Sequence, residues 1–532
     1  MQVTALNLAW ALARTTSVRR FHAALKDPLA TQQRWLSQFL SANAHTAYGR
    51  AHGYGRISSI AQFRERVPVS NYETLTPWIS RIERGEREVL THEQVRVLER
   101  TSGSVAGPKH VPYTAGLLGD FGAATGPWLD DLSRAFPSLF TTRQYWSLSP
   151  VARDAEVTSG GVRIGLEDDT EYFDAATRFA MKRLFVVEGS VARLRDLEVW
   201  RRKTLTQLLA AEDLGFISIW NPSFLTLLME ALRHDWPSYR EALSPRRRDD
   251  IDARLERAGD FVGEALWPRL RVISCWTDAW AAQAVPGLRR FFPHTPFQGK
   301  GLLATEGVVS FPLWGQRAPV AAVTSHFLEF ESLDDGTFHG VHELREGARY
   351  APLLTTRGGF ARYRLSDVVR CVGFLARAPL LQFEGRLDRG SDLRGEKLNA
   401  AFVEAAVRAT LQEHPAAFAL VAPELEEPPR YVVYVEGAAQ PETLAADLEQ
   451  RFCEAMHYRY ARELGQLGPV VARAVTRGEA RYVAALQSRG VRLGDIKPSG
   501  FDPRPGWAAV FGGLRSDTCS GSSRRSSTCR KT

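Results

Sequence analysis

The sequence predicts an α/β protein with a large, multi-layered N-terminal domain, which has α/β sheets and a β-barrel-like part, and a small α/β C-terminal domain. The chain has 532 residues, which is too long for a single hydrophobic core. Strand and helix patterns alternate across residues 215–310, which is typical of a parallel sheet. After about residue 384 the pattern of helices and strands starts again, as expected for a separate domain.

The N-terminal region, residues 1–100, is mostly helical in pattern. Apolar residues recur at helical spacing: Leu25, Leu29, Trp35, Leu36, Phe39 and Leu40. Residues 93–100 (EQVRVLER) alternate apolar and charged side chains, which predicts a strand. Residues 101–109 then form a loop that leaves this strand, and residues 116–136 predict a helix.

Two buried strands are predicted at residues 216–220 (FISIW) and 270–276 (LRVISCW), with helices at 193–211 and 280–292. Asn221-Pro222-Ser223 predicts the start of another helix, because proline is favoured in a first turn. Residues 295–308 turn through Gly299 and Gly301 into a further strand. From 320 to 374 short strands predict an antiparallel meander or barrel; they lie at 327–330, 353–356, 360–365 and 368–374.

The last part of the chain predicts helices at 398–411 and 444–456 and strands at 418–421, 431–435 and 470–475. We therefore expect an N-terminal domain over residues 1–384, a small C-terminal domain over 385–513, and a disordered Ser/Arg-rich tail over 514–532.

The composition favours a soluble globular protein over a nucleic-acid or membrane protein. Half of the net charge of +8 comes from the tail, which has five basic residues and one acidic residue, so we expect no nucleic-acid partner. The five cysteines have no CxxC spacing, which indicates a reducing compartment and a cytoplasmic location. No charged segment precedes the apolar start and no apolar run reaches about 18 residues, so we expect neither a leader nor a membrane span.

The loop Thr101-Ser-Gly-Ser-Val-Ala-Gly-Pro-Lys109 has the chemistry of a phosphate-binding loop. Gly103 and Gly107 permit close approach of a ligand to backbone N–H groups, and the hydroxyls and Lys109 add donors and charge. It is not a Walker A loop, because only three residues separate the two glycines and Pro108 precedes the lysine. A plain Ser/Gly surface turn is the alternative.

Three further stretches follow in order: residues 298–307 (QGKGLLATEG), 360–374 (FARYRLSDVVRCVGF) and 385–398 (GRLDRGSDLRGEKL). With the loop, this order resembles the nucleotide motifs of adenylate-forming ligases. Residues 274–278 (SCWTD), the QGKG stretch and the YRLSD stretch more closely resemble the auxin-responsive acyl-acid amido synthetases, in a bacterial-type version. The resemblance extends to about residue 512.

The resemblance implies an ATP-dependent ligase that forms carbon–nitrogen bonds: it adenylates a carboxylic acid and transfers the acyl group to an amino acid. It implies that Thr101, Ser102, Gly103, Ser104 and Lys109 bind the ATP phosphates. It further implies roles for residues of the later stretches: Thr305 at the adenylate phosphate, Glu306 as the magnesium ligand, Asp367 and Arg386 at the ribose, Asp388 as the hinge of a mobile C-terminal domain, and Lys497 as a catalytic lysine. ATP and magnesium are the expected cofactors, and we expect a monomer.

Each of these residues also has a purely structural interpretation. Glu306 could end a strand, Asp367 could cap a turn, Arg386 could pair with Glu384 or Asp388, and Lys497 could be a surface lysine. Only eight of the 68 basic residues are lysines, so each retained lysine suggests a need for a small ammonium group.

Three positions depart from the family pattern: Ser366 replaces a usual glycine, Leu302 a usual aromatic, and Val105 a usual hydroxyl residue. These departures leave open a nucleotide-binding protein that has lost catalysis. The shared first half-reaction leaves open an acyl-adenylate ligase with a thiol acceptor such as coenzyme A.

Overall fold

The computed structural model describes residues 2–100, 109–147, 156–165, 183–194, 196–387, 390–391, 393–394, 396, 398–489, 491, 496 and 499–512. The chain divides into two compact units. The larger contains Met1–Gly390, Asn399–Arg408 and Leu486–Gly500, and the smaller contains Ser391–Leu398, Ala409–Ala485 and Phe501–Thr532. The predicted boundaries after residues 384 and 513 remain predictions.

The N-terminal region is helical, as its periodicity predicts. Its helices are α1 (Gln2–Ala24), α2 (Pro28–Asn43), α3 (Ala47–Ala51), α4 (Ile60–Arg66) and α5 (Tyr72–Glu83). Asp27 caps α2 by accepting from the Ala30 N–H, and Asn71 forms a capping box with Thr74 at the start of α5. Both starts are therefore encoded locally.

A four-stranded parallel sheet forms the centre of the α/β part of the larger unit. Its strands, in spatial order, are β3 (Arg143–Trp146), β6 (Leu214–Ser218), β7 (Val272–Cys275) and β8 (Phe297–Gly299). On one face, Phe216 and Trp146 pack against Trp128 of α6 (Ala115–Ala135). On the other, Tyr145 and Ile217 belong to a core shared with the helices that follow β3. The predicted strand–helix alternation is confirmed.

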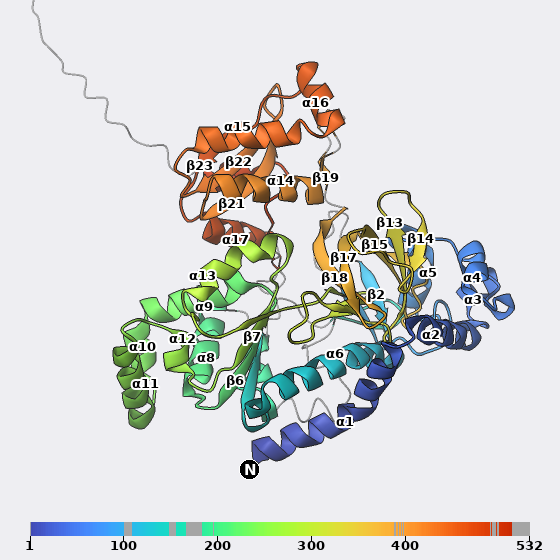
Figure 1. Cartoon of the computed structure of the whole chain (residues 1–532), viewed down its shortest axis with the longest axis horizontal. Helices are drawn as coiled ribbons and strands as arrows, with labels where there is room; N and C mark the ends of the chain where they lie inside the picture. Colours follow the sequence, from blue (N-terminus) through green and yellow to red (C-terminus); the bar gives the residue numbers. More distant parts are fainter. Residues whose placement is uncertain are drawn as a thin grey trace, which may run out of the picture. The chain divides into compact units, whose positions relative to one another are not determined.

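Several helices line this second face, and Figure 1 draws them in green near β6 and β7. They are α8 (Leu197–Ala210), α9 (Pro222–His234), α10 (Trp236–Glu241), α11 (Pro245–Ala258), α12 (Gly263–Leu266) and α13 (Val285–Arg289). The helix predicted over 280–292 is shorter than expected. A 3-10 helix, η5, covers Ala279–Ala284, and α13 begins next to Pro286, whose ring provides no N–H to continue a preceding helix.

An eight-stranded antiparallel sheet follows. Its order is β11 (Ser310–Phe311), β12 (Val320–Ala321), β18 (Ala378–Arg386), β17 (Asp367–Leu375), β15 (Arg349–Thr355), β13 (Phe327–Ser332) and β14 (Phe338–Gly340), with β16 (Tyr363–Arg364) also paired to β15. The strand predicted over 360–365 is reduced to β16, since Arg362 has a positive φ of 48° that interrupts extended backbone. The antiparallel pattern is confirmed, and β11 and β14 are its two edges.

A smaller sheet carries the loop that opens the nucleotide motifs. Its order is β2 (His110–Tyr113), β1 (Val97–Arg100), β5 (Arg163–Ile164) and β4 (Glu156–Val157). Because β1 and β2 pair antiparallel with Arg100 opposite His110, the loop between them starts and ends at one edge. The strand predicted before residue 101 is confirmed as β1, although it is shorter than expected, and residues 101–108 lie outside the described part of the chain.

The smaller unit has a three-stranded sheet in the order β21 (Phe418–Glu424), β22 (Arg430–Glu436) and β23 (Val471–Ala474). Its helices include α15 (Pro441–Phe452), α16 (Met456–Glu463) and α18 (Trp507–Phe511), while α14 (Ala400–Glu413) and α17 (Gly478–Ser488) extend across the division into units. The helix predicted over 444–456 ends earlier, at Phe452.

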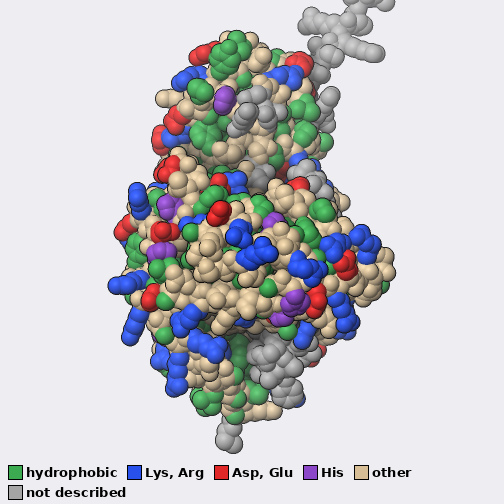
Figure 2. Space-filling model, turned by 90° about the vertical axis from the view of Figure 1, so that its right-hand side faces the viewer, with side chains coloured by type: hydrophobic (Ala, Val, Ile, Leu, Met, Phe, Trp, Pro, Cys, Tyr) green, Lys and Arg blue, Asp and Glu red, His purple; other side chains and the backbone are tan. Residues whose placement is uncertain are grey.

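On the face shown in Figure 2, Lys and Arg side chains are scattered among Asp and Glu instead of forming one stripe. None of the described helices combines the length and the hydropathy that a membrane-spanning helix needs. Cys275, Cys371 and Cys453 are free thiols.

Candidate functional site

A two-residue turn presents Thr305 and Glu306. The short strands β9 (Leu303–Ala304) and β10 (Gly307–Val308) pair antiparallel with Ala304 opposite Gly307, which leaves Thr305 and Glu306 at the tip. The Tyr113 hydroxyl at the end of β2 donates to the Thr305 carbonyl over 2.6 Å. This bond ties the tip to the strand that follows the phosphate-loop stretch.

Asp367 and Arg386 face each other at the ends of two long strands. Asp367 begins β17 and Arg386 ends β18, and the register pairs them directly. The Leu387 N–H donates to the Ser366 carbonyl over 2.7 Å, which keeps the strands together beyond this pair. Asp367 is buried and Arg386 half-buried. Opposite charges on directly paired residues stabilise such a rung.

The tip and the rung share one electrostatic environment. Burial raises the pKa of Glu306, and the neighbouring Asp367 carboxylate raises it further. Arg386 and Lys109 act in the opposite direction and lower the pKa of Glu306. Four of the residues predicted from separate motifs therefore lie within electrostatic reach of one another.

A fifth side chain in this group, Tyr363 of β16, was not predicted. Its hydroxyl donates to the Glu306 carboxylate, and burial together with Glu306 raises the pKa of Tyr363. The residue lies inside the FARYRLSD stretch, but nothing in the spacing distinguishes it from a core aromatic. Its place in the fold comes from the pairing of β16 with β15, which joins residues about ten positions apart.

Lys109 is held at the exit of the phosphate-loop stretch. Its Nζ lies 5.6 Å from the centre of the Tyr72 ring, and the neighbouring His110 N–H donates to the Tyr72 hydroxyl over 2.8 Å. His110 Nδ1 lies 2.7 Å from Glu83 Oε1. Tyr72 and Glu83 both belong to α5, so this helix orients Lys109, the cation predicted to bind phosphate.

A buried group behind the turn was also missed. His326 Nε2 accepts from the Val308 N–H over 3.0 Å, and His326 Nδ1 lies 3.7 Å from Asp120 Oδ2 on α6. Asp120 Oδ1 in turn lies 3.0 Å from Arg357 Nη1. Sequence separations of more than two hundred residues between Asp120 and its partners hide this cluster from any local pattern.

Several predicted residues lie outside the described part of the chain: Thr101, Ser102, Gly103, Ser104, Asp388 and Lys497, together with Val105. The residue next to Lys497 is described. The Ile496 carbonyl accepts from Asn221 Nδ2 over 3.2 Å, and Asn221 also caps α9.

The departures from the family pattern that are described have ordinary surroundings. Leu302 packs against the core of the larger unit, and its N–H donates to the Ser310 hydroxyl over 3.0 Å. The Ser366 carbonyl accepts the hydrogen bond from the Leu387 N–H, beyond the Asp367–Arg386 pair. Neither residue removes a charge from the group around Glu306.

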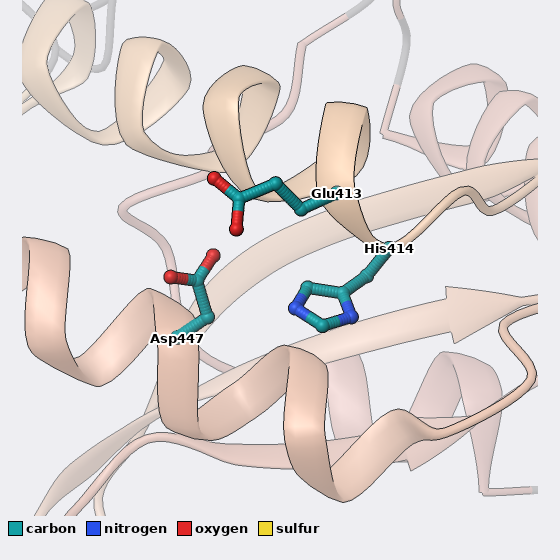
Figure 3. A group of neighbouring side chains, drawn as sticks. All are labelled: Glu413, His414 and Asp447. Carbon is teal, nitrogen blue, oxygen red and sulfur yellow. The ribbon is translucent and has the colours of Figure 1, made fainter.

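Glu413, His414 and Asp447 form the group with metal-ligand geometry among the described residues (Figure 3). Both carboxylates already contact Arg451, with Nη2 2.6 Å from Glu413 and Nε 3.0 Å from Asp447. Arg451 therefore supplies the positive charge that a cation would bring. We interpret the group as a surface ion-pair network of the smaller unit.

Family models match most of the chain. They are the GH3 family N-terminal domain at residues 17–247, the GH3 family central domain at 320–386, and the GH3 family C-terminal domain at 401–501.

Individual relatives agree with these models. The chain is 25% identical over 531 residues to the indole-3-acetic acid-amido synthetase GH3.8 of Oryza sativa subsp. indica, covering 88% of this chain and 87% of that protein. The solved AtGH3.15 acyl acid amido synthetase in complex with 2,4-DB superposes with a TM-score of 0.81 at 19% identity, over 93% of this chain and 95% of that one. A 2-hydroxyisobutyryl-CoA ligase in complex with R3-HIB-AMP matches with a TM-score of 0.51 at 12% identity, over 90% of each chain.

Proposed function

The chain belongs to the GH3 family, and from this premise we propose that it is an ATP-dependent acyl-acid amido synthetase. In the first step the substrate carboxylate attacks the α-phosphorus of ATP, forming acyl-AMP and releasing pyrophosphate. In the second step the amine of an amino acid attacks the acyl carbon, forming the amide and releasing AMP. Both steps depend on positioning and charge neutralisation and need no protein nucleophile.

The observation that carries this proposal is the grouping of Glu306 with Asp367, Arg386 and Lys109. Two carboxylates and two cations within reach of one another match what a nucleotide phosphate and ribose require. Asp367 would accept from the ribose hydroxyls with Arg386 beside it, and Lys109 would contact phosphate oxygens. A carboxylate accepting hydroxyl donors is a strong, charge-assisted interaction.

Glu306 would hold magnesium. The fit rests on its environment: burial and Asp367 both raise its pKa, so a bound cation would relieve the cost of keeping this carboxylate charged. Magnesium prefers carboxylate oxygen and retains waters, which suits a half-exposed turn such as Thr305–Glu306. When bound, the ion would neutralise phosphate charge. Thr305, whose carbonyl is fixed by Tyr113, would contact the adenylate phosphate.

The remaining roles are assigned by the family pattern alone. Thr101, Ser102, Gly103 and Ser104 would surround the phosphates, Asp388 would serve as the hinge, and Lys497 would act in the first step. We also propose that the enzyme is a cytoplasmic monomer without nucleic-acid or membrane partners. Size-exclusion chromatography with light scattering would test the monomeric state, and cell fractionation would test the cytoplasmic location.

Pyrophosphate release over a library of carboxylic acids, with and without amino acids, tests the activity. We expect release with at least one acid and a product whose mass equals acid plus amino acid minus water. Offering coenzyme A alongside the amino acids decides the acceptor, since a thioester product instead of an amide would contradict the proposal. Absence of turnover with every acid, together with no ATP binding by calorimetry, would overturn it.

A further inference from the structure

A row of side chains crosses the carboxyl ends of the parallel sheet on the face toward α6. The register pairs Trp146 with Ser218, Ser218 with Ser274, and Ser274 with Gln298. Directly paired residues project to the same face, so these four side chains form one line. In parallel α/β sheets, ligands bind beyond the carboxyl ends of the strands.

Two members of this row have unused hydrogen-bonding capacity. Ser274 Oγ and Gln298 Nε2 are buried and make no hydrogen bond within the described part of the chain. Ser274 is 0% and Gln298 5% exposed. The other side of the Gln298 amide is fixed, because its Oε1 accepts from Trp128 Nε1 over 2.8 Å. Buried polar atoms without a protein partner are uncommon, and both of these atoms are free to bond a ligand group or a water.

Lys300 extends its amine over this row. Its Nζ donates to Ser218 Oγ over 2.8 Å and lies 4.9 Å from the centre of the Trp128 ring and 5.0 Å from that of Trp220. The residue is only 8% exposed, and its N–H donates to the Cys275 carbonyl over 3.0 Å. The backbone hydrogen bond therefore fixes the start of the Lys300 side chain, and the two indoles fix the position of its amine.

The amine lacks a carboxylate partner among the described side chains. An ammonium group has three protons to donate, and the serine hydroxyl uses one. Aromatic faces stabilise a cation but do not replace an anion or acceptor. Burial accordingly lowers the pKa of Lys300 to about 7. A ligand oxygen placed here would satisfy a group that the protein alone leaves under-satisfied.

The distance from Lys300 to the turn at Thr305 determines which part of a substrate it could meet. Tyr113, which holds the Thr305 carbonyl, stacks on Phe121 of α6 with ring centres 6.0 Å apart. Trp128, whose ring lies against the Lys300 amine, follows Phe121 by two helical turns, about 10 Å along the helix axis. The two groups thus contact parts of α6 that lie about 10 Å apart, which is about the length of a small substrate. An acid whose carboxylate reacts near Thr305 could therefore extend to Lys300.

Aromatic rings flank Lys300. Trp220 and Trp276 are half-buried at the carboxyl ends of β6 and β7, with ring centres 5.8 Å apart. Trp128, on the inner side of the amine, is buried. Half-exposed indoles beside a buried amine combine apolar walls with one polar anchor, the usual make-up of a small-molecule site.

We propose that Lys300 is a specificity residue that binds an oxygen substituent at the end of the acyl substrate remote from the reacting carboxylate. The substrate class would then be carboxylic acids with a distal carboxylate or hydroxyl group. This inference rests on the proposed acyl-activating function. A purely structural lysine, which only spaces two tryptophans, would show no such preference.

The experiment compares matched acids on the wild type and on Lys300→Met. Two pairs serve: hexanoate with adipate, and phenylacetate with 4-hydroxyphenylacetate. We expect kcat/KM for pyrophosphate release to favour the oxygen-bearing member of at least one pair in the wild type. Lys300→Met should reduce this preference by tenfold or more, because methionine keeps the length of the side chain without the amine. Lys203→Met, at an exposed lysine on α8, is the matched control and should leave the preference unchanged.

Calorimetric titration of the same acids into the protein without ATP separates this inference from the proposed function. If no acid is turned over but the oxygen-bearing acid binds the wild type more tightly than it binds Lys300→Met, the activity proposal fails and the Lys300 assignment stands. An equal preference in wild type and Lys300→Met, or no binding of either member of a pair, would overturn the assignment. A Lys300→Met protein that fails to fold would be replaced by Ser218→Ala, which removes the hydroxyl that orients the amine and should also reduce the preference.

Discussion

Nδ1 of His326 lies 3.7 Å from Oδ2 of Asp120, and both side chains are buried behind the turn that carries Glu306. Because His326 Nε2 accepts from the Val308 N–H, the ring proton lies on Nδ1 and faces Asp120. Burial lowers the pKa of His326 to about 3, so the ring is neutral at physiological pH. A neutral histidine thus lies between α6 and the strand that follows Glu306, and it is hydrogen-bonded to that strand.

Replacing His326 with alanine should destabilise the protein. The change leaves the buried Val308 N–H without an acceptor and opens a cavity, which together cost about 2–4 kcal/mol in the free energy of unfolding. Urea unfolding measures the loss, with His294→Ala at an exposed histidine as control. A loss below about 0.5 kcal/mol, the range of ordinary surface substitutions, would show that the bond is not important.

Gly307→Ala tests how closely the turn must approach His326. A Cβ at this position would lie 2.8 Å from His326 Nε2 and 3.2 Å from Leu354 Cδ1, and neither group can move freely in the core. We expect the turn to shift and pyrophosphate release to fall tenfold or more, since an error near 1 Å in a catalytic group has effects up to about a hundredfold. Gly119→Ala on α6, where a Cβ meets nothing within 4 Å, should retain full activity and gain about 0.5–1 kcal/mol.

Glu306→Gln should separate stability from function. The folded-state pKa of Glu306 is raised above its unfolded value, so at neutral pH its ionisation opposes folding, and stability increases as pH falls toward the folded pKa. The neutral amide should therefore raise the melting temperature of the ligand-free protein while greatly reducing magnesium-dependent ATP binding. Differential scanning fluorimetry with and without ATP, magnesium and a chelator reads both effects.

The same pKa shift predicts an acidic limit for the wild type. As pH falls, Glu306 takes up a proton at a higher pH than an ordinary glutamate does, so magnesium-dependent ATP binding should weaken earlier than nucleotide affinity in Glu306→Gln. Glu230→Gln, at an exposed position on α9, should behave as the wild type does. A ligand-free melting temperature of Glu306→Gln lower than that of the wild type would contradict the raised pKa of the Glu306 carboxylate.

Asp367→Asn tests the ribose contact without depending on stability. If Asp367 accepts from a ribose hydroxyl, the substitution should weaken ATP binding about tenfold to a hundredfold, the usual range for a charge-assisted hydrogen bond. The 2′-deoxy or 3′-deoxy analogue that lacks this hydroxyl should bind wild type and variant with similar affinity. Equal losses for ATP and both analogues, measured by calorimetry, would place Asp367 in a structural role opposite Arg386.

The sequence predicted the parts of this fold that local rules determine. Trp35, Leu36, Phe39 and Leu40 are all buried on α2, because helical spacing places them on one face. Asn221 and Pro222 start α9 as expected, because their chemistry favours a cap and a first turn. In contrast, β16 is shorter than predicted, because Arg362 has a positive φ, and the buried contact that this residue makes with Glu329 is one that no local pattern contains.

The candidate site was predictable only where a charge stood in an ordered motif. Glu306, Asp367, Arg386 and Lys109 were found in this way. Strand register pairs Asp367 with Arg386, and Glu306, at the tip of a separate hairpin, lies within electrostatic reach of both. Tyr363, His326 and Lys300 do their work through partners distant in sequence. A tyrosine in a strand and a histidine among apolar residues look like ordinary core residues until pairing and burial are known.

Lys497 lies outside the described residues but follows Ile496, whose carbonyl accepts from Asn221 near the carboxyl end of β6. An ammonium group meeting the carboxylate and α-phosphate would offset charge that develops as the acyl–phosphate bond forms. Its removal in Lys497→Ala should therefore lower acyl-adenylate formation by about 10²–10³. The second step does not build charge on phosphorus in this way, so amide formation from preformed acyl-adenylate should be much less affected. Rapid-quench measurement of each half-reaction, with Lys203→Ala as control, tests this split; equal losses in both steps, or none in the first, would make Lys497 a surface lysine.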